Sequence, residues 1–453
     1  MRLRIPDANL LEGKMLKNVL LFAIPIMFSS ILQILFNATD VIVVGKFAGE
    51  LELAAVGSTG SIISLIVNLC IGFSVGTNVL VARHIGTRDG EAIKRTVHSS
   101  MLLSILLGIL AGTLLYVLSE KFLGLMQTPA DILPSATAYL MAYAVGVPAS
   151  IIYNFGTAIL RARGDTVRPL YFLIIAGIVN VCLNLIFVIV FHMGAVGVGV
   201  ATAVAQYVSA GLVIFCLSRE QGPTKLYFSR LRLHKKEMAS IITIGFPAGL
   251  QSSFFSISNM IIQASINSFG AMVVAGNAAA SNVENFVYVA MNAVYQTMLT
   301  LAGQNMGAKQ WKRVDKGLGV CLGTVSAIGI LMGMLVLLFD EQILSIYSSD
   351  PQVIYWGSKR FWFVAIPYFI CGIMEVVMGA VRGLGQSVIP MVVSLFGVCV
   401  FRVLWIYTIF QRYHTLECLL ISYIISWVLT TIAHSITYLV VRKKVRRAEM
   451  VVT

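Results

Sequence analysis

Residues 161–169 read RARGDTVRP, and residues 382–390 read RGLGQSVIP. Arg, Gly, Thr or Ser, Val and Pro recur in register between these segments, at a separation of 221 residues. The same separation, or one residue more, relates three further pairs: Gly49 and Gly270, Gly86 and Gly307, and Pro25 and Pro247. One repeated glycine would mean little, but several matches at one separation indicate that the chain contains two homologous halves.

The composition around these segments is that of a membrane protein. Of the 453 residues, 58% are hydrophobic and 12% are charged, and the mean hydropathy is +0.87. A soluble globular chain carries about 25% charged residues. The high hydrophobic content and low charged content exclude an ordinary soluble enzyme, a nucleic-acid-binding protein and a disordered chain.

A transmembrane helix needs roughly 20 apolar residues, and apolar runs of that length recur along the sequence. We therefore predict an all-α integral membrane protein with twelve transmembrane helices in two homologous six-helix bundles. The predicted spans are 18–44, 53–81, 97–118, 136–160, 169–191, 196–218, 238–264, 271–301, 317–339, 361–381, 387–410 and 417–441.

The basic residues predict the orientation, because loops on the cytoplasmic side of a membrane are enriched in Lys and Arg. Most of the 33 Lys and Arg residues fall on one side of the predicted spans, including Arg2, Arg4, Lys14 and Lys17 at the N-terminus and Arg442, Lys443, Lys444, Arg446 and Arg447 near the C-terminus. The opposite loops hold Lys46, Lys121, Lys359, Arg360 and Arg412. We expect a multi-pass protein of the cell membrane with both termini in the cytoplasm and no signal peptide. The net charge of +13 then requires no nucleic-acid partner.

The repeat and the spans together predict the domain organisation. An N-terminal lobe over 1–218 and a C-terminal lobe over 238–453 are joined by a basic cytoplasmic linker, 219–237. Because six is even, both lobes insert the same way round. This is a transporter architecture in which substrate binds between halves that rock. We expect a monomer surrounded by membrane lipid.

Apart from Glu417 at the first position of the last predicted span, three acidic residues fall within the predicted spans: Asp40, Glu284 and Glu375. Charges in the bilayer are costly, so such residues usually face a cavity or a partner. Asn180, Asn184 and Thr202 lie at about the depth of Asp40. These hard oxygen atoms with one negative charge suit Na⁺ or a proton held on Asp40. The alternative is that the Asn and Thr side chains only join neighbouring helices.

The C-terminal half has no acid at the position that repeats Asp40, which is Ile261. By depth, Arg402 is a better partner for Glu284 than for Glu375, and the pair either fixes helix packing or leaves a carboxylate to attract cationic substrate. We take Asn154, Glu284, Glu375 and Arg402 as candidates for a substrate cavity. Several aromatic side chains could stack on an aromatic compound, although packing explains each of them better: Tyr139, Tyr143, Tyr153, Phe254, Phe255, Phe286 and Tyr288.

Motifs for other chemistry are missing from the sequence. The seven cysteines lie singly and no CxxC occurs, so they are interpreted as structural thiols. The six histidines form no pair at metal-ligand spacing. No GxxxxGK[ST] loop indicates use of ATP. We expect no cofactor other than a coupling ion.

The chain resembles the multidrug and toxic compound extrusion (MATE) transporters. The resemblance rests on the two parallel six-span halves, Pro25 before Asp40, the ArgGly…Pro segment at 382–390 and GlyGlnAsnMetGlyAla at 303–308. It covers essentially the whole chain. It implies export of organic, often cationic and aromatic, compounds in exchange for Na⁺ or H⁺.

The resemblance is closest to the DinF-like side of the family, in which an acid of the first helix couples transport to the ion. Asp40 matches that acid, and Asn180 and Thr202 match the cluster around it. Asn184 departs from it, since some members carry a carboxylate there. The NorM-like branch carries acids on helices 7 and 10. Here Cys371 occupies the helix-10 position and helix 7 has no acid, so the resemblance does not imply that C-terminal ion site. Pro25 resembles a proline proposed to bend helix 1, and its other interpretation is a static kink.

The sequence leaves three candidate functions to compare. The first is a secondary drug antiporter. The second is an exporter or flippase of a lipid-linked or metabolic intermediate, which a strongly cationic cavity would favour. The third, an intramembrane enzyme, needs a paired catalytic set within the bilayer, and the sequence shows none.

Overall fold

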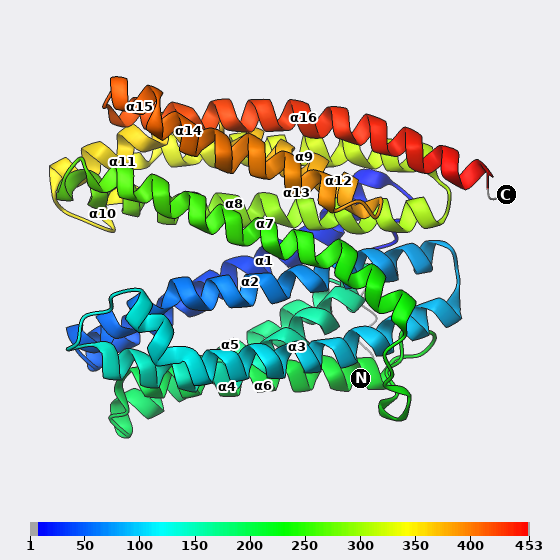
Figure 1. The fold of residues 1–453 in the computed structure, drawn as a ribbon, viewed down its shortest axis with the longest axis horizontal. Helices are drawn as coiled ribbons and strands as arrows, with labels where there is room; N and C mark the ends of the chain where they lie inside the picture. The colour runs from blue at the N-terminus through cyan, green and yellow to red at the C-terminus, as the bar shows by residue number, and fades with distance from the viewer. Residues whose placement is uncertain (1–7, 452–453) are drawn as a thin grey trace. The chain divides into compact units, whose positions relative to one another are not determined.

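The computed structural model describes residues 8–451, so Arg2 and Arg4 of the orientation argument lie outside the described residues. This part of the chain contains helices and no strand. The first half runs through α1 (Met15–Phe47), α2 (Glu50–Gly86), α3 (Gly90–Leu125), α4 (Leu133–Arg163), α5 (Val167–Leu185), the π-helix η1 (Ile186–Val190) and α6 (Gly194–Arg219). A linker with the 3₁₀ turn η2 (Phe228–Arg230) follows (Figure 1).

The second half has more breaks than the first. It runs through α7 (Lys235–Asn267), α8 (Ala271–Gly307), α9 (Trp311–Leu338), α10 (Asp340–Ser345), α11 (Pro351–Val364), α12 (Tyr368–Gly383), α13 (Val388–Ser394), the π-helix η3 (Leu395–Val400), α14 (Phe401–Tyr407), α15 (Ile409–Arg412) and α16 (Leu416–Val451). Each of the twelve predicted spans corresponds to a helix or a broken helix, so the all-α membrane fold is confirmed.

Ten helices of the described chain are long and apolar enough to cross a membrane, or eleven if α11 and α12 form one span bent by 49°. The remaining long helix is α8, of 37 residues, which carries Asn277, Glu284 and Asn292. These side chains bond to other residues of the same half, as described below. The low hydropathy of α8 therefore reflects interior polar contacts.

The predicted tenth span, 361–381, begins too late. Helix α11 starts at Pro351, where the Asp350 side chain accepts a hydrogen bond from the Gln352 backbone at 2.8 Å. An acidic N-cap followed by proline is a common helix start. As a consequence Arg360, predicted in an outer loop, lies in a helix and is 5% exposed.

Contacts divide the described chain into two compact units. Unit 1 is Phe28–Gly249 with Ala8, and unit 2 is Asn9–Met27 with the described residues from Leu250 onward. The limits fall inside α1 and α7, two residues after Pro25 and Pro247 respectively. Each of these proline-containing helices therefore contributes one part to each unit.

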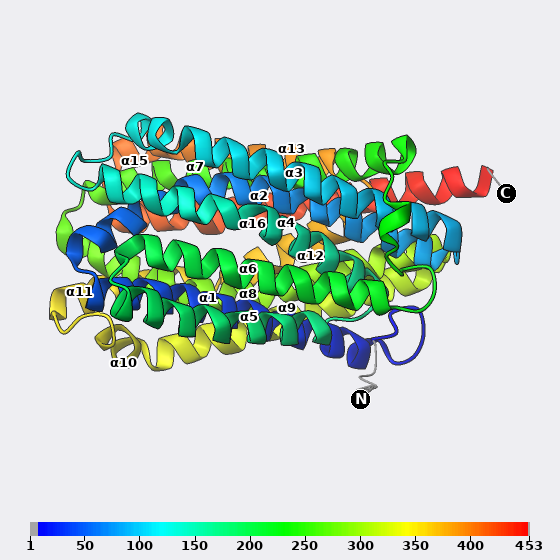
Figure 2. The ribbon, with the colours of Figure 1, turned by 90° about the horizontal axis from the view of Figure 1, so that it is seen from below.

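Within unit 1, α4 packs against α2, α3 and α6, and Figures 1 and 2 show α3 and α4 side by side. The first part of α7 is held on α2 by facing glycines. A Cβ on Gly72 would lie 2.3 Å from the Gly249 backbone nitrogen, and one on Gly76 would lie 2.3 Å from the Ile241 oxygen. A Cβ on Gly245 would lie 2.5 Å from the Cα of Phe73. Small residues four apart permit this close approach between membrane helices.

Unit 2 is built around α8 and α12. Helix α8 packs against α9, α11 and α12, and α12 also packs against α16. The apolar core of this unit includes Ile262, Met374 and Trp427. The unit also buries polar groups of α8, α11 and α12, which hydrogen bonding must satisfy.

Candidate functional site

Asp40 lies in unit 1 in a cluster of three polar side chains from α5 and α6. Its Oδ1 accepts a hydrogen bond from Asn184 Nδ2 at 2.5 Å, and its Oδ2 accepts one from Thr202 Oγ1 at 3.3 Å. Asn180 donates to Thr202 Oγ1 and accepts from Asn184 Nδ2, both at 3.3 Å. The structure thus brings together all four residues that the sequence analysis grouped by depth.

A close contact between Gly177 and Phe36 also joins α5 to α1. A Cβ on Gly177 would lie 1.9 Å from the ring of Phe36, which precedes Asp40 by one helical turn. Only glycine leaves room for this ring. On α5, the π-helix η1 begins two residues after Asn184, and π-helical turns often occur at functional sites because they re-aim side chains.

An apolar cluster adjoins the Asp40 group toward the end of α1. It contains Val43 and Val44 of α1, Val188 of η1 and Val198 of α6, with Val56, Tyr139 and Ala195. Val44, Val188 and Val198 each lie four residues, or about one turn, from Asp40, Asn184 and Thr202 respectively. Buried apolar side chains therefore lie one turn from the Asp40 group on all three elements.

The Asp40 group has the chemistry of a site for one small cation. Among the described residues, no Lys, Arg or His lies within ion-pair distance of Asp40. Asn184 is fully buried, and its Oδ1 has no hydrogen-bond partner in the described chain. The group offers carboxylate, amide and hydroxyl oxygens, the ligands that hard cations prefer. The same part of the chain contains no group of three or more His, Cys, Asp or Glu arranged for a metal ion.

The predicted pairing of Glu284 with Arg402 is wrong. In unit 2, Glu284 binds Arg360 through two hydrogen bonds, from Nε at 2.9 Å and from Nη2 at 2.7 Å. Arg360 Nη1 also donates to Asn277 Oδ1 at 2.5 Å. Estimating depth from the sequence missed this pair because Arg360 was assigned to a loop.

Arg402 has a different environment from the one predicted. Its Nε donates to Ser426 Oγ at 2.9 Å, and its guanidinium lies 4.2 Å from the ring centre of Tyr423 and 5.8 Å from that of Trp427. It is 4% exposed, and its Nη2 has no hydrogen-bond partner in the described chain. A cation over aromatic faces is stabilised without a carboxylate.

Glu375 is the other buried acid of unit 2, at 6% exposure. It accepts hydrogen bonds from Asn292 Nδ2 at 3.2 Å and from the Tyr288 hydroxyl at 3.4 Å. No basic side chain of the described residues forms an ion pair with it. Tyr288, one of the aromatic candidates, therefore contacts a carboxylate.

The remaining predicted residues contact their own helices or none of the groups above. Pro25 lies inside α1, about four turns before Asp40 along the helix. Asn154 is half-buried and donates to the Ser150 carbonyl of its own helix at 2.8 Å. Tyr153 donates to the Pro169 carbonyl at 3.2 Å.

Two residues of the predicted motifs make structural contacts within unit 2. Asn305 of the 303–308 motif donates to the Leu10 carbonyl at 3.1 Å. Arg382 donates to Tyr295 at 2.9 Å and to Gln251 at 2.7 Å. These contacts join α8 to the segment before α1, and α12 to α7 and α8.

Sequence reasoning missed Glu220, which lies just after α6. It forms ion pairs with Arg163 and Arg168, and Arg168 also pairs with Asp165. Burial raises the pKa of Glu220, but its bonds to Arg168 and Arg163 outweigh burial and leave the pKa below its ordinary value of 4.5. The cluster closes the turn that follows α4. In the sequence, Glu220 is an acid that follows a predicted helix near a basic motif. This pattern is too common to identify the ion-pair cluster.

Comparisons with known proteins agree with this architecture. The MatE family matches residues 25–186 and 247–408, two segments that begin 222 residues apart. The probable multidrug resistance protein YpnP of Bacillus subtilis (strain 168) is 28% identical over 392 residues, 86% of this chain and 87% of that protein. The FAD transporter of Shewanella oneidensis is 24% identical over 371 residues, 80% of each protein.

A crystal structure of MATE in complex with MaL6 has the same fold. Its TM-score is 0.91 at 20% sequence identity, and the match covers 98% of this chain and 100% of that one. The family matches two segments of the chain, the fold is that of MATE structures, and most of the long helices are apolar enough to cross a membrane. The chain belongs to the MatE family of multi-pass membrane transporters and is not an enzyme.

Proposed function

We propose that this transporter exports organic, often cationic and aromatic, compounds by alternating access, in antiport with H⁺ or Na⁺. Relatives named as multidrug resistance proteins support the substrate class. The observation that carries the coupling mechanism is the Asp40 group, in which, among the described residues, the carboxylate has no basic partner and the neighbouring buried amide oxygen of Asn184 has no hydrogen-bond partner.

The hydrogen bonds of Asp40 suit an ionised carboxylate, since Asn184 Nδ2 and the Thr202 hydroxyl both donate to it. A proton on Asp40 removes the charge and one acceptor. A bound Na⁺ neutralises the charge of Asp40. Na⁺ also needs oxygen ligands, and rotation of the Asn184 amide supplies one. In both cases the bonds that join α1 to α5 and α6 change.

Antiport requires that ion and substrate favour different states of the protein, because coupling is a free-energy link between sites. We propose that loading Asp40 repacks α1 around Pro25 and disfavours the substrate-bound state. Pro25 is suited to this because proline removes a backbone hydrogen bond within a helix.

We also propose Glu375 as the carboxylate that attracts cationic substrates. It is a buried acid of unit 2 without an ion-pair partner in the described chain, whereas Glu284 is neutralised by Arg360. Asn154 in unit 1 and Arg402 in unit 2 remain candidates for contact with substrate.

The remaining parts of the proposal concern membrane placement. We place both termini and the 219–237 linker on the cytoplasmic side, and we take 1–218 and 238–453 as the two repeat lobes of a monomer. Lys and Arg enrichment supports the orientation. The transporter then needs no cofactor beyond its coupling ion.

The test is dye efflux from proteoliposomes under Na⁺ and H⁺ gradients that are imposed separately. We expect one gradient to drive efflux and the other to leave it at the rate without a gradient. Efflux at equal rates with either gradient and with none would contradict antiport.

A second candidate is export of an anionic, aromatic metabolite. Arg402 favours it, because this buried guanidinium lacks a carboxylate in the described chain and has an unpartnered Nη2. A relative named FAD transporter has such a substrate. Competition of flavin nucleotides against dye efflux separates the two candidates, since only the second predicts inhibition.

A further inference from the structure

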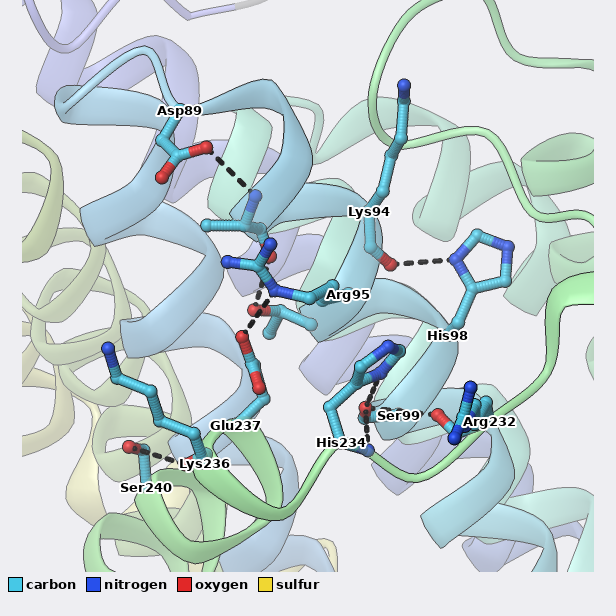
Figure 3. Close-up of polar contacts among 12 residues, drawn as sticks. Asp89, Lys94, Arg95, His98, Ser99, Arg232, His234, Lys236, Glu237 and Ser240 are labelled. Atoms are coloured by element: carbon cyan, nitrogen blue, oxygen red, sulfur yellow. Dashed lines mark hydrogen bonds and ion pairs between the residues drawn. The ribbon is translucent and has the colours of Figure 1, made fainter.

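The start of α3 and the linker after α6 enclose a polar pocket in unit 1. Its volume is about 420 Å³, and its walls include Lys94 and Arg95 of α3 and Arg230 and Arg232 of the linker. Figure 3 shows the polar contacts around it. The pocket lies at the end of the helices, outside the Asp40 group.

The charge of this pocket is positive. Lys94 pairs with Glu91 at 2.7 Å, and Arg95 pairs with Glu237 at 2.8 Å. Arg230 and Arg232 are exposed and form no ion pair in the described part of the chain. Two guanidinium groups are thus available to an anion, and guanidinium matches the geometry of phosphate oxygens.

The linker wall is held on α3 by buried side chains. His98 is 3% exposed, and its ring contacts the Lys94 carbonyl through Nδ1 at 2.7 Å and accepts from the Tyr227 backbone through Nε2 at 3.1 Å. Ser99 donates to the Arg232 carbonyl at 3.2 Å and accepts from the His234 backbone at 3.0 Å (Figure 3). The backbone that carries both free arginines is therefore fixed before a ligand arrives.

Aromatic side chains beside the pocket point to a membrane ligand. Tyr227 is 38% exposed and Phe228 is 60% exposed, and the Arg230 guanidinium lies 5.1 Å from the Tyr227 ring centre. Exposed aromatic residues next to cations at the ends of membrane helices are typical of the lipid–water interface. Basic pockets at this level bind the headgroups of anionic lipids.

We propose that this pocket binds the phosphate of an anionic phospholipid headgroup, with Arg230 and Arg232 contacting the phosphate and Tyr227 and Phe228 lying among the neighbouring lipids. A phospholipid headgroup and free inorganic phosphate both present a phosphate group to these arginines. The aromatic side chains favour the lipid. Bound lipid would join the linker more firmly to α3.

The test titrates phosphatidylglycerol into the purified full-length protein in detergent and follows the rise of its thermal unfolding temperature. Each cation near an anionic lipid surface contributes about 1 kcal/mol, so Arg230→Gln with Arg232→Gln should weaken apparent lipid affinity about 30-fold. The matched control, Lys443→Gln with Lys444→Gln, removes the same charge from α16 and should bind as the unmodified protein does. Arg230→Lys with Arg232→Lys should keep most of the affinity.

Three results would overturn the proposal. One is unchanged affinity for phosphatidylglycerol in the Arg230→Gln, Arg232→Gln variant when the unmodified protein binds. Another is equal stabilisation by phosphatidylcholine, which carries no net charge. The third is full stabilisation by about 10 mM inorganic phosphate with no further effect of phosphatidylglycerol, which identifies a free anion site. None of these readouts requires transport, so they stand apart from the coupling proposal.

Discussion

Removing the charge of Glu284 should destabilise unit 2 through Arg360. Both side chains are 7% exposed, and Arg360 makes two bonds to Glu284 and one to Asn277. Glu284→Gln leaves the guanidinium buried without its counter-charge. Breaking a buried pair in this way costs about 3–5 kcal/mol. At roughly 2–4 °C per kcal/mol for a unit of this size, the unfolding temperature should fall by about 10 °C.

The assay is thermal unfolding of the purified protein in one detergent, for Glu284→Gln, Arg360→Met and the double variant. Neutralising both groups should cost less than neutralising either alone, because no uncompensated charge then remains. A second cycle, Glu284→Gln with Arg402→Met, serves as control and should show weaker coupling, since Arg402 donates to Ser426 and shares only the Tyr423 ring with Arg360. Additive losses in the Glu284–Arg360 cycle, or coupling only in the control cycle, would refute this reasoning.

Three further predictions concern unit 1. Gly177→Ala should lower the free energy of unfolding by about 1–3 kcal/mol and reduce gradient-driven efflux, because the added Cβ displaces the Phe36 ring. Adding Phe36→Ala to this variant should restore stability and efflux. If the double variant restores neither, the contact between Gly177 and Phe36 is excluded. The ion pairs of Glu220 should stabilise the protein above pH 4.5, and that contribution should disappear as the pH falls through the depressed pKa of Glu220. The unfolding temperatures of the unmodified protein and of Glu220→Gln should therefore converge in acid. A constant difference between them down to pH 3 would contradict the assignment of these ion pairs. Gly76→Leu should prevent folding or export because α7 leaves no room for its side chain, and normal expression and efflux would show that α2 and α7 are not packed this closely.

Hydropathy and the repeat were sufficient to predict the helices, because membrane helices are long and apolar and each half repeats the same order. The Asp40 group was also predictable. Asn180 and Asn184 share a helix face at an i,i+4 spacing, and residues at one depth in a small bundle have few other partners. The contact of Phe36 with Gly177 was not predictable, since one sequence does not specify which faces of two helices meet.

The Glu284 partner shows where depth alone fails. Estimating depth treats each helix as straight and each charged residue near a span end as part of a loop. Helix α11 begins ten residues earlier than predicted and bends after Val364, and this places Arg360 in the interior. The acidic cap and proline at 350–351 were the local signal for that start. Glu220 and Arg168 gave no comparable signal, because many acids and bases lie near each other in loops.

The central claim is that Asp40 couples the ion to export, and Asp40→Asn tests it most directly. The variant mimics the neutral carboxyl permanently and keeps the size of the side chain, so it should insert and fold. At matched expression in proteoliposomes, we expect no efflux against a substrate gradient, and any remaining substrate movement should not depend on the Na⁺ or H⁺ gradient. Glu375→Gln, the comparison variant, should keep ion-dependent efflux while its affinity for cationic substrate falls. Gradient-driven efflux by Asp40→Asn at the rate of the unmodified protein would show that the ion is coupled elsewhere.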